Sequence, residues 1–334
     1  MIGTIRSIMD KFNRYTEIFI AFGIIAIIGI IIIPIPSGFL DFLLVCNISL
    51  GVIVLLLTLF TKNVLEFSTF PTLLLVATMF RLALNISSTR LILGEGDAGH
   101  VIDAFANFVT GNNYIVGAVV FIIITIVQMV VVTNGAGRVS EVTARFTLDA
   151  MPGKQMAIDA DLNAGLIDEQ SAKLRRKNLE REANFYGAMD GASKFVKGDA
   201  IAGIIITLVN LVGGILIFSV RDGIGIMDAL DKFGKLTIGD GLVGQVPALL
   251  ISIASGILVT RSDDGQSFGT SLVGELFGVS QVMIISAAVL FLIGLVPAFP
   301  MLPFTIVALG LGITGYLLIE NDKAEIVQNN LQAE

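Results

Sequence analysis

The chain has 334 residues, of which 54% are hydrophobic and only 15% are charged, and its mean hydropathy is +0.87. A soluble domain carries about 25% charged residues, so this composition excludes an ordinary soluble protein and indicates a membrane protein. The formal net charge of −7 argues against a nucleic-acid partner, because surfaces that bind nucleic acid are basic.

Eight apolar runs follow one another along the chain, and each approaches the length of about 20 residues that a spanning helix needs. They cover residues 18–33, 42–60, 67–86, 115–133, 200–220, 242–260, 282–296 and 304–319. We therefore expect an all-α polytopic membrane protein with about eight transmembrane helices.

Local signals add detail to the second and third runs and to the stretch between the third and fourth. Asp41 stands where it can cap the second run, and Pro71 falls in the first turn of the third, where its missing N–H costs little. Between the third and fourth runs, Val101, Phe105 and Phe108 recur at helical spacing, which predicts an amphipathic helix.

A polar segment, residues 134–199, interrupts the apolar pattern. It holds ten lysines and arginines and ten acidic residues. Charges are costly in lipid, so we expect a mixed-charge loop in water. With eight spans and a cytoplasmic amino terminus, sixteen lysines and arginines fall on the cytoplasmic side and four on the other, with Arg81 inside a span. This asymmetry predicts that both termini and the polar segment are cytoplasmic.

The expected organisation has four parts. Residues 1–134 carry transmembrane helices one to four, 135–200 form the cytoplasmic loop, and 201–320 carry helices five to eight. Residues 321–334 are polar, and the family resemblance given below implies that they begin a linker to a further soluble domain.

Common catalytic and cofactor sites are not indicated. The chain has one histidine, His100, and one cysteine, Cys46, which gives no thiolate or imidazole metal site and no credible nucleophile–histidine set. The glycines of residues 187–194 lack the spacing of a nucleotide-binding loop. We expect no enzyme activity, no cofactor and no metal.

Four amides, Asn47, Gln128, Asn210 and Gln245, lie in or near apolar runs. Hydrogen bonds between helices explain them, and a polar cavity lined by them is the alternative.

Two acidic residues, Asp199 and Asp240, stand one or two positions before apolar runs and beside glycines. Helix capping explains an aspartate at such positions. The alternative is a proton-responsive carboxylate, because desolvation near lipid disfavours the ionised form and a neighbouring cation favours it. Asp149 and Asp159 are weaker candidates for the same role. The cations that could support these acids are Arg138, Arg145, Lys194, Lys197, Lys154, Arg81 and Arg90.

Five stretches resemble one family of proteins. They are residues 81–90, 137–146, 149–165, 185–200 and 237–242. Together they are similar to the signatures of the FHIPEP family, the export-gate proteins of flagellar and virulence type III secretion, and the flagellar branch is the more similar. The resemblance covers essentially the whole chain.

The resemblance implies a subunit of a protein-export gate in the bacterial inner membrane that couples the proton motive force to the translocation of unfolded flagellar substrates. It implies a homo-oligomeric ring, a nonamer, together with other gate subunits and lipid. Substrates and chaperones would bind a large soluble domain that follows the last span in the family. The alternatives are a secondary transporter or ion channel, the virulence form of the same gate, or a scaffold. A transporter is expected to show internal repeats, and residues 1–134 and 201–320 show no convincing similarity.

Overall fold

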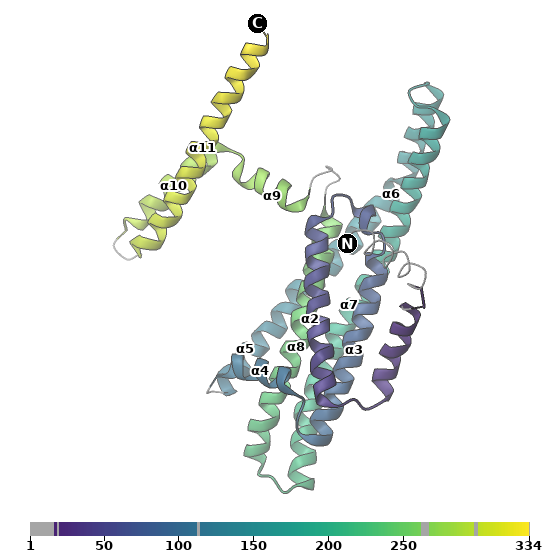
Figure 1. The fold of residues 1–334 in the computed structure, drawn as a ribbon, viewed down its shortest axis with the longest axis vertical. Coiled ribbons are helices and arrows are strands. Elements are labelled where there is room, and N and C mark those ends of the chain that lie inside the picture. Colours follow the sequence, from purple (N-terminus) through teal and green to yellow (C-terminus); the bar gives the residue numbers. More distant parts are fainter. Residues whose placement is uncertain (1–16, 19, 112–113, 262–266, 297–299, 334) are drawn as a thin grey trace, which may run out of the picture. The chain divides into compact units, whose positions relative to one another are not determined.

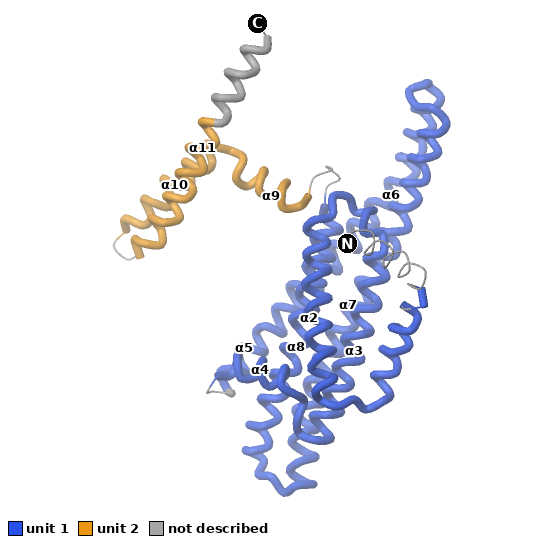
Figure 2. Tube along the Cα trace, in the orientation of Figure 1, with its two compact units in different colours: residues 1–262 blue, residues 263–334 orange. Residues whose placement is uncertain are grey.

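The structure is a computed structural model that describes residues 17–18, 20–111, 114–261, 267–296 and 300–333. All regular secondary structure in these residues is helical, which confirms the predicted all-α class. The chain divides into two compact units, residues 1–262 and 263–334 (Figure 2). The helices of the first unit are α2 (Ser37–Phe60), η1 (Val64–Phe67), α3 (Phe70–Glu95), α4 (His100–Thr110), α5 (Tyr114–Ile126), η2 (Val127–Thr133), α6 (Asn134–Asn163), α7 (Glu169–Arg221) and α8 (Ile226–Thr260).

The number of long apolar helices is smaller than the eight runs suggested. Six helices of the described residues are long and apolar enough to cross a membrane. A seventh span results if α9 (Phe268–Phe277) and α10 (Ser280–Gly294), which meet at a bend of 65°, are counted as one. The first apolar run gives only the shorter helix Ile20–Ile32. The chain is a polytopic α-helical membrane protein, as predicted.

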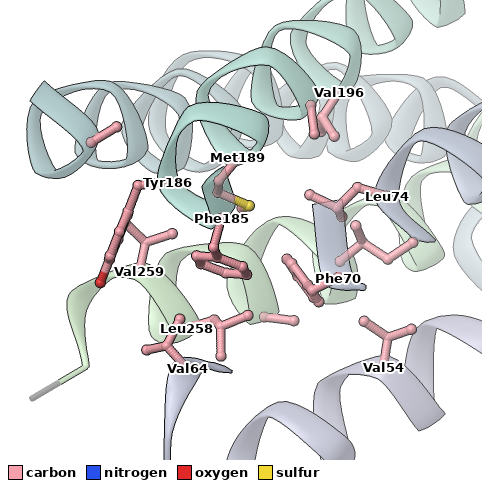
Figure 3. Packing of buried hydrophobic residues seen from close by; sticks show 14 of the residues in the cluster. Val54, Val64, Phe70, Leu74, Phe185, Tyr186, Met189, Val196, Leu258 and Val259 are labelled. Atoms are coloured by element: carbon pink, nitrogen blue, oxygen red, sulfur yellow. The ribbon is translucent and has the colours of Figure 1, made fainter. Parts of the chain in front are cut away.

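In the first unit, α2, α3, α7 and α8 lie side by side as a bundle (Figure 1). One apolar cluster joins the turn between α2 and α3 to α7 and α8, and it contains Val64, Phe70, Phe185 and Leu258 (Figure 3). A second cluster packs the beginning of α2 and the end of α3 against Phe218 and Phe233. Each end of the bundle therefore has its own core.

The polar segment is a helical hairpin rather than the expected loop (Figure 1). The fourth apolar run passes through the π-helical turn η2 directly into α6, and α7 returns and continues into the fifth run. The two arms share a small apolar core of Met151, Ile158, Ala172 and Leu179. This buried stripe explains why a charged segment is ordered, because helix stability comes largely from packing an amphipathic face.

Two aspartates cap helices in this unit. Asp168 is the N-cap of α7, where its side chain accepts a hydrogen bond of 2.9 Å from the Ser171 amide. Hydrogen bonds from Ser171 lower the pKa of Asp168 below its ordinary value. Asp41 does not cap its own helix, which begins at Ser37. It accepts bonds of 2.9 Å from the amides of His100 and Val101 and thereby caps α4.

The predicted amphipathic helix is α4, and it packs on α8. Its most buried residues are Ile102, Ala106 and Thr110, whereas Phe108 is 88% exposed. The buried face of α4 is therefore the face of Ile102, Ala106 and Thr110, and it differs from the face that the spacing of Val101, Phe105 and Phe108 indicated. Pro71 lies in the first turn of α3, as predicted.

The second unit contains α9, α10 and α11 (Met301–Ala333), and α10 packs along α11. Gly315 of α11 lies against Met283 and Ile284 of α10, so closely that a methyl group would collide with them. A small residue at such a crossing permits close approach of two helices in a membrane.

Close packing against a glycine also generates a prediction for the first unit. A methyl group at Gly214 would collide with the ring of Phe233, whereas the space beside Gly187 on the same helix is open. We expect Gly214→Ala to destabilise the protein by about 1–3 kcal/mol through overpacking. Gly187→Ala is the matched control, and it should stabilise the helix by up to about 1 kcal/mol. Thermal unfolding in detergent measures both, and equal shifts in the same direction would contradict the packing.

Candidate functional site

A buried ion pair joins α3 to α7. Arg81 of α3 and Asp199 of α7 form a salt bridge through Nη2 and Oδ2, and the two residues are only 5% and 4% exposed. Both lie among apolar side chains in helices that the hydropathy of the chain assigns to the membrane. Removing two charges from water is expensive, so each of these residues depends on the other.

The positions of both residues correct the predicted helix limits. The third apolar run was expected over residues 67–86, with Arg81 near its end, but α3 continues to Glu95 and places Arg81 in its middle turns. Asp199 was expected just before a helix, but α7 runs without a break from Glu169 to Arg221. A charged side chain can lie inside a spanning helix when a partner on a neighbouring helix pairs with it.

Asp240 is a second buried acid, 7% exposed, on α8. Its Oδ2 accepts a hydrogen bond of 2.9 Å from Nδ2 of Asn210, which is itself fully buried on α7. The Ser88 hydroxyl of α3 lies near this carboxyl group but donates its hydrogen bond to the Asn85 carbonyl at 3.0 Å. Asp240 thus has neutral polar neighbours, whereas Asp199 is paired with a cation.

The glycines beside Asp240 explain its burial. A methyl group at Gly239 would collide with the Ile102 carbonyl of α4, and one at Gly241 would collide with the Phe121 ring of α5. The sequence Gly-Asp-Gly thus lets two helices approach α8 on either side of the acid and exclude solvent from it.

The capping explanation is wrong for both acids. The N-cap of α7 is Asp168 and that of α8 is Gly225, so Asp199 and Asp240 lie well inside their helices. An apolar run shows which residues can face lipid, but it does not show where a helix begins or ends. A helix continues as long as its backbone hydrogen bonds are made and its side chains are packed.

A cavity of about 340 Å³ adjoins both acids. Arg81, Asp199 and Asp240 line it, together with Asn85, Thr125 and Gln245. Apolar side chains of α5 and α7, such as Ile126 and Ile204, form much of the remaining wall. Residues of α3, α5, α7 and α8 thus contribute both polar and apolar side chains to the cavity wall.

Three of the four amides fit the two explanations offered for them, and Asn47 fits neither. Gln128, in the π-helical turn η2, and Gln245 line the cavity. Asn210 bonds to Asp240 from the neighbouring helix. Asn47 is buried in α2 and lies outside the cavity wall.

The remaining predicted acids and cations of residues 134–199 are not gathered at this site. Asp149, Arg138 and Lys197 are exposed on the helices α6 and α7. The others form exposed or half-exposed ion pairs, namely Arg176 with Asp159, Lys154 with Glu182 at 2.9 Å, Lys194 with Asp190 at 2.8 Å and Arg145 with Glu141 at 3.6 Å. Surface pairs of this kind contribute about 0–1 kcal/mol each. The cation that meets Asp199 is thus Arg81, one of the seven candidates, whereas Arg138, Arg145, Lys194 and Lys197 are exposed on the helices of the hairpin.

Arg90 lies closer to the C-terminal end of α3 than Arg81 and has a different role. Its guanidinium donates hydrogen bonds to the carbonyl oxygens of Ile31 at 3.0 Å and Ile32 at 3.2 Å. These are carbonyls at the end of the first apolar helix, which have no partner within that helix. Arg90 therefore fastens the end of that helix to α3.

Sequence reasoning missed Ser88 and Thr125. Hydroxyl side chains are common in membrane helices, where they bond back to the preceding turn, so neither residue differs from its surroundings in sequence. Only the approach of α8 brings Ser88 near Asp240 and Thr125 into contact with Gln245.

The fold and this site define a class: a polytopic α-helical membrane protein with ionisable residues paired inside its apolar bundle and a charged helical hairpin outside it. The FHIPEP family model matches residues 27–334, and the chain belongs to that family.

Relatives support the assignment. The flagellar biosynthesis protein FlhA of Salmonella typhimurium is 52% identical over 307 residues, which cover 90% of this chain and 44% of that protein. FlhA of Bacillus subtilis is 53% identical over 279 residues, with 84% and 41% covered. Protein MxiA of Shigella flexneri is 47% identical over 323 residues, with 96% and 47% covered. The chain spans less than half the length of these relatives, and no solved structure matches it. Its relatives and its apolar helices make it a bacterial membrane protein.

The buried pair generates a prediction about stability. Arg81→Met leaves Asp199 buried without its cation, and we expect a loss of about 3–5 kcal/mol. Asp199→Leu likewise leaves Arg81 buried without its counter-charge. The double variant removes both charges and should lose less than the sum of the two single variants, by at least about 1 kcal/mol.

Thermal unfolding of the four proteins in detergent completes this cycle. Glu141 and Arg145 form an exposed pair on α6, and the same cycle on that pair is the control, with an expected coupling of about 0.3–0.5 kcal/mol. Additive losses at Arg81 and Asp199 would show that the two residues do not interact.

Proposed function

We propose that this chain is the membrane part of an export-gate component of the flagellar type III protein export apparatus, and that it couples the proton motive force to the translocation of unfolded substrates. The observation that carries the proposal is the buried pair of Arg81 and Asp199 beside Asp240 and a cavity. The names of the relatives supply the flagellar and export context.

The chemistry of the pair suits a proton-dependent switch. An ionised Asp199 attracts Arg81, and protonation removes that attraction and leaves a buried cation without its counter-charge. The energetic consequence is large because both groups are buried away from bulk solvent. A change in the relative positions of α3 and α7 relieves it, which is the two-state element that such a switch requires.

Helix α7 offers a route for transmission. It carries Asp199 and continues to Glu169 at the tip of the hairpin, roughly 45 Å away at 1.5 Å per residue. A shift of α7 at the buried pair therefore moves the hairpin. Glycines 187, 191 and 198 lie in this stretch and would allow a hinge, but α7 is helical through all three, which favours movement of the helix as a whole.

We also propose a homo-oligomeric ring in the inner membrane, a nonamer as in the family, with other gate subunits as neighbours. The hairpin exposes several large apolar side chains outside the apolar runs, among them Phe146, Met156 and Leu174 at 60–70% exposure. Apolar side chains on a charged surface are typical of protein contacts. Substrates and chaperones would bind parts of the longer relatives that this chain does not span.

Two other functions remain candidates. The virulence form of the same gate is favoured by 47% identity to MxiA, although the flagellar relatives are slightly more similar. A secondary transporter or channel is favoured by the intramembrane cavity alone. In each case the proposed role is transport rather than catalysis.

The proton role predicts a specific loss of export. Asn at position 199 keeps an oxygen that accepts a hydrogen bond from Arg81 but cannot ionise. We expect Asp199→Asn, in the full-length protein, to reach the membrane at normal levels and to reduce proton-driven export on the order of a hundredfold, as loss of a proton-transfer group does. Secretion of flagellar substrates into the medium measures it.

Asp159→Asn is the matched control, because Asp159 also pairs with an arginine but is exposed on the hairpin. It should export normally. Normal export by Asp199→Asn, at equal membrane levels, would refute the proton role of that residue and leave Asp240 to be tested in the same way.

The proposed orientation places the hairpin in the cytoplasm and the turn between α7 and α8 outside. Leu166 at the hairpin tip is 75% exposed and Ile226 at the start of α8 is 72% exposed. In a Cys46→Ser background, an impermeant thiol reagent added to whole cells should label Ile226→Cys and spare Leu166→Cys. The opposite pattern would invert the proposed topology.

A further inference from the structure

Three buried polar atoms of residues that line the cavity lack hydrogen-bond partners among the described residues. They are Oδ1 of Asp199, Nη1 of Arg81 and Oε1 of Gln245. The three residues come from three different helices and line the same cavity. Leaving such atoms without partners is costly, and more so for charged groups. An occupant of the cavity that forms hydrogen bonds would remove this cost.

Neighbouring hydrogen bonds fix the direction in which Gln245 points its oxygen. The Thr125 hydroxyl donates to the Phe121 carbonyl at 2.8 Å, which leaves its oxygen free to accept. Gln245 donates from Nε2 to that oxygen at 2.7 Å. The nitrogen of the amide is therefore held against α5, and Oε1 is left as an acceptor.

The cavity is large enough for several water molecules. Water fills about 30 Å³ per molecule in the liquid and needs two to four polar partners, and the cavity has about 340 Å³. A water molecule both donates and accepts, so water molecules in the cavity can satisfy the oxygens of Asp199 and Gln245 and the N–H of Arg81. An apolar occupant satisfies none of them.

We propose that this cavity binds a chain of ordered water molecules that connects the Arg81–Asp199 pair with Asp240, and that Gln245 is a positioning residue for it. The role of this chain rests on the proton-coupled function proposed above. A hydrated proton in the chain transfers one proton to Oδ1 of Asp199. One O–H bond breaks in the hydrated proton, which becomes water, and one forms on the carboxyl group, which becomes neutral.

Hydration is tested apart from export by solid-state NMR of the chain in lipid bilayers, with transfer of magnetisation from water to labelled side-chain amides. Gln155, exposed on α6, is the reference for full contact with water, and Asn47, buried outside the cavity, is the reference for none. We expect Gln245 to gain signal at a rate near that of Gln155. A rate equal to that of Asn47 would overturn the water site and indicate a lipid chain or a neighbouring helix in the cavity.

The positioning role is tested with Gln245→Met, which keeps the length of the side chain and removes the acceptor. Asn47→Leu is the control, because it also removes a buried amide but lies outside the cavity. At equal membrane levels of the full-length protein, Gln245→Met should reduce export on the order of tenfold or more, since proton transfer depends on positioned hydrogen-bond partners. Asn47→Leu should not.

Normal export by Gln245→Met, or an equal loss in Asn47→Leu, would overturn the positioning role. The outcome that separates the two proposals is a hydrated Gln245 together with normal export by Asp199→Asn. In that case the water site stands and the proton-coupled function of Asp199 fails.

Discussion

The arrangement of the first unit depends on one electrostatic constraint, the ion pair that Arg81 and Asp199 make inside an apolar bundle. Neither charge can be left alone at that depth, because the loss of hydration is repaid only by a close opposite charge and by further hydrogen bonds. The pair therefore fixes the register of α3 against α7. It also explains why two helices with a charge in their middle turns remain continuous.

Other polar groups in the bundle follow the same rule and have partners on another helix. Asn210 of α7 donates to Asp240 of α8, and Gln245 of α8 donates to Thr125 of α5. Asp41 of α2 caps α4 rather than its own helix. Among apolar side chains these bonds are shielded from bulk solvent, so they specify which helices are neighbours even where their contribution to stability is modest.

Small residues and continuous helices connect this buried polar centre with the surface. The glycines on both sides of Asp240 allow α4 and α5 to close over it, and the long helix α7 carries the chain from the buried pair to the charged hairpin. The hairpin in turn is ordered by its own apolar core, with ion pairs on its exposed faces. The single helix α7 thus runs from the buried ion pair inside the bundle into the hairpin outside it. This continuity gives the proposed coupling a physical basis.

The sequence by itself determined the membrane class, the all-α fold, the approximate positions of the apolar segments and the family, since these depend on composition and on local motifs. It also singled out Asp199, Asp240 and Arg81 as unusual residues. The tertiary structure alone decided that the polar segment is a hairpin, that both acids lie inside helices, and that Arg81 is the cation that meets Asp199. The reason is physical: helix ends and charge partners inside a bundle depend on contacts between residues far apart in the chain, whereas hydropathy reports only which residues can face lipid.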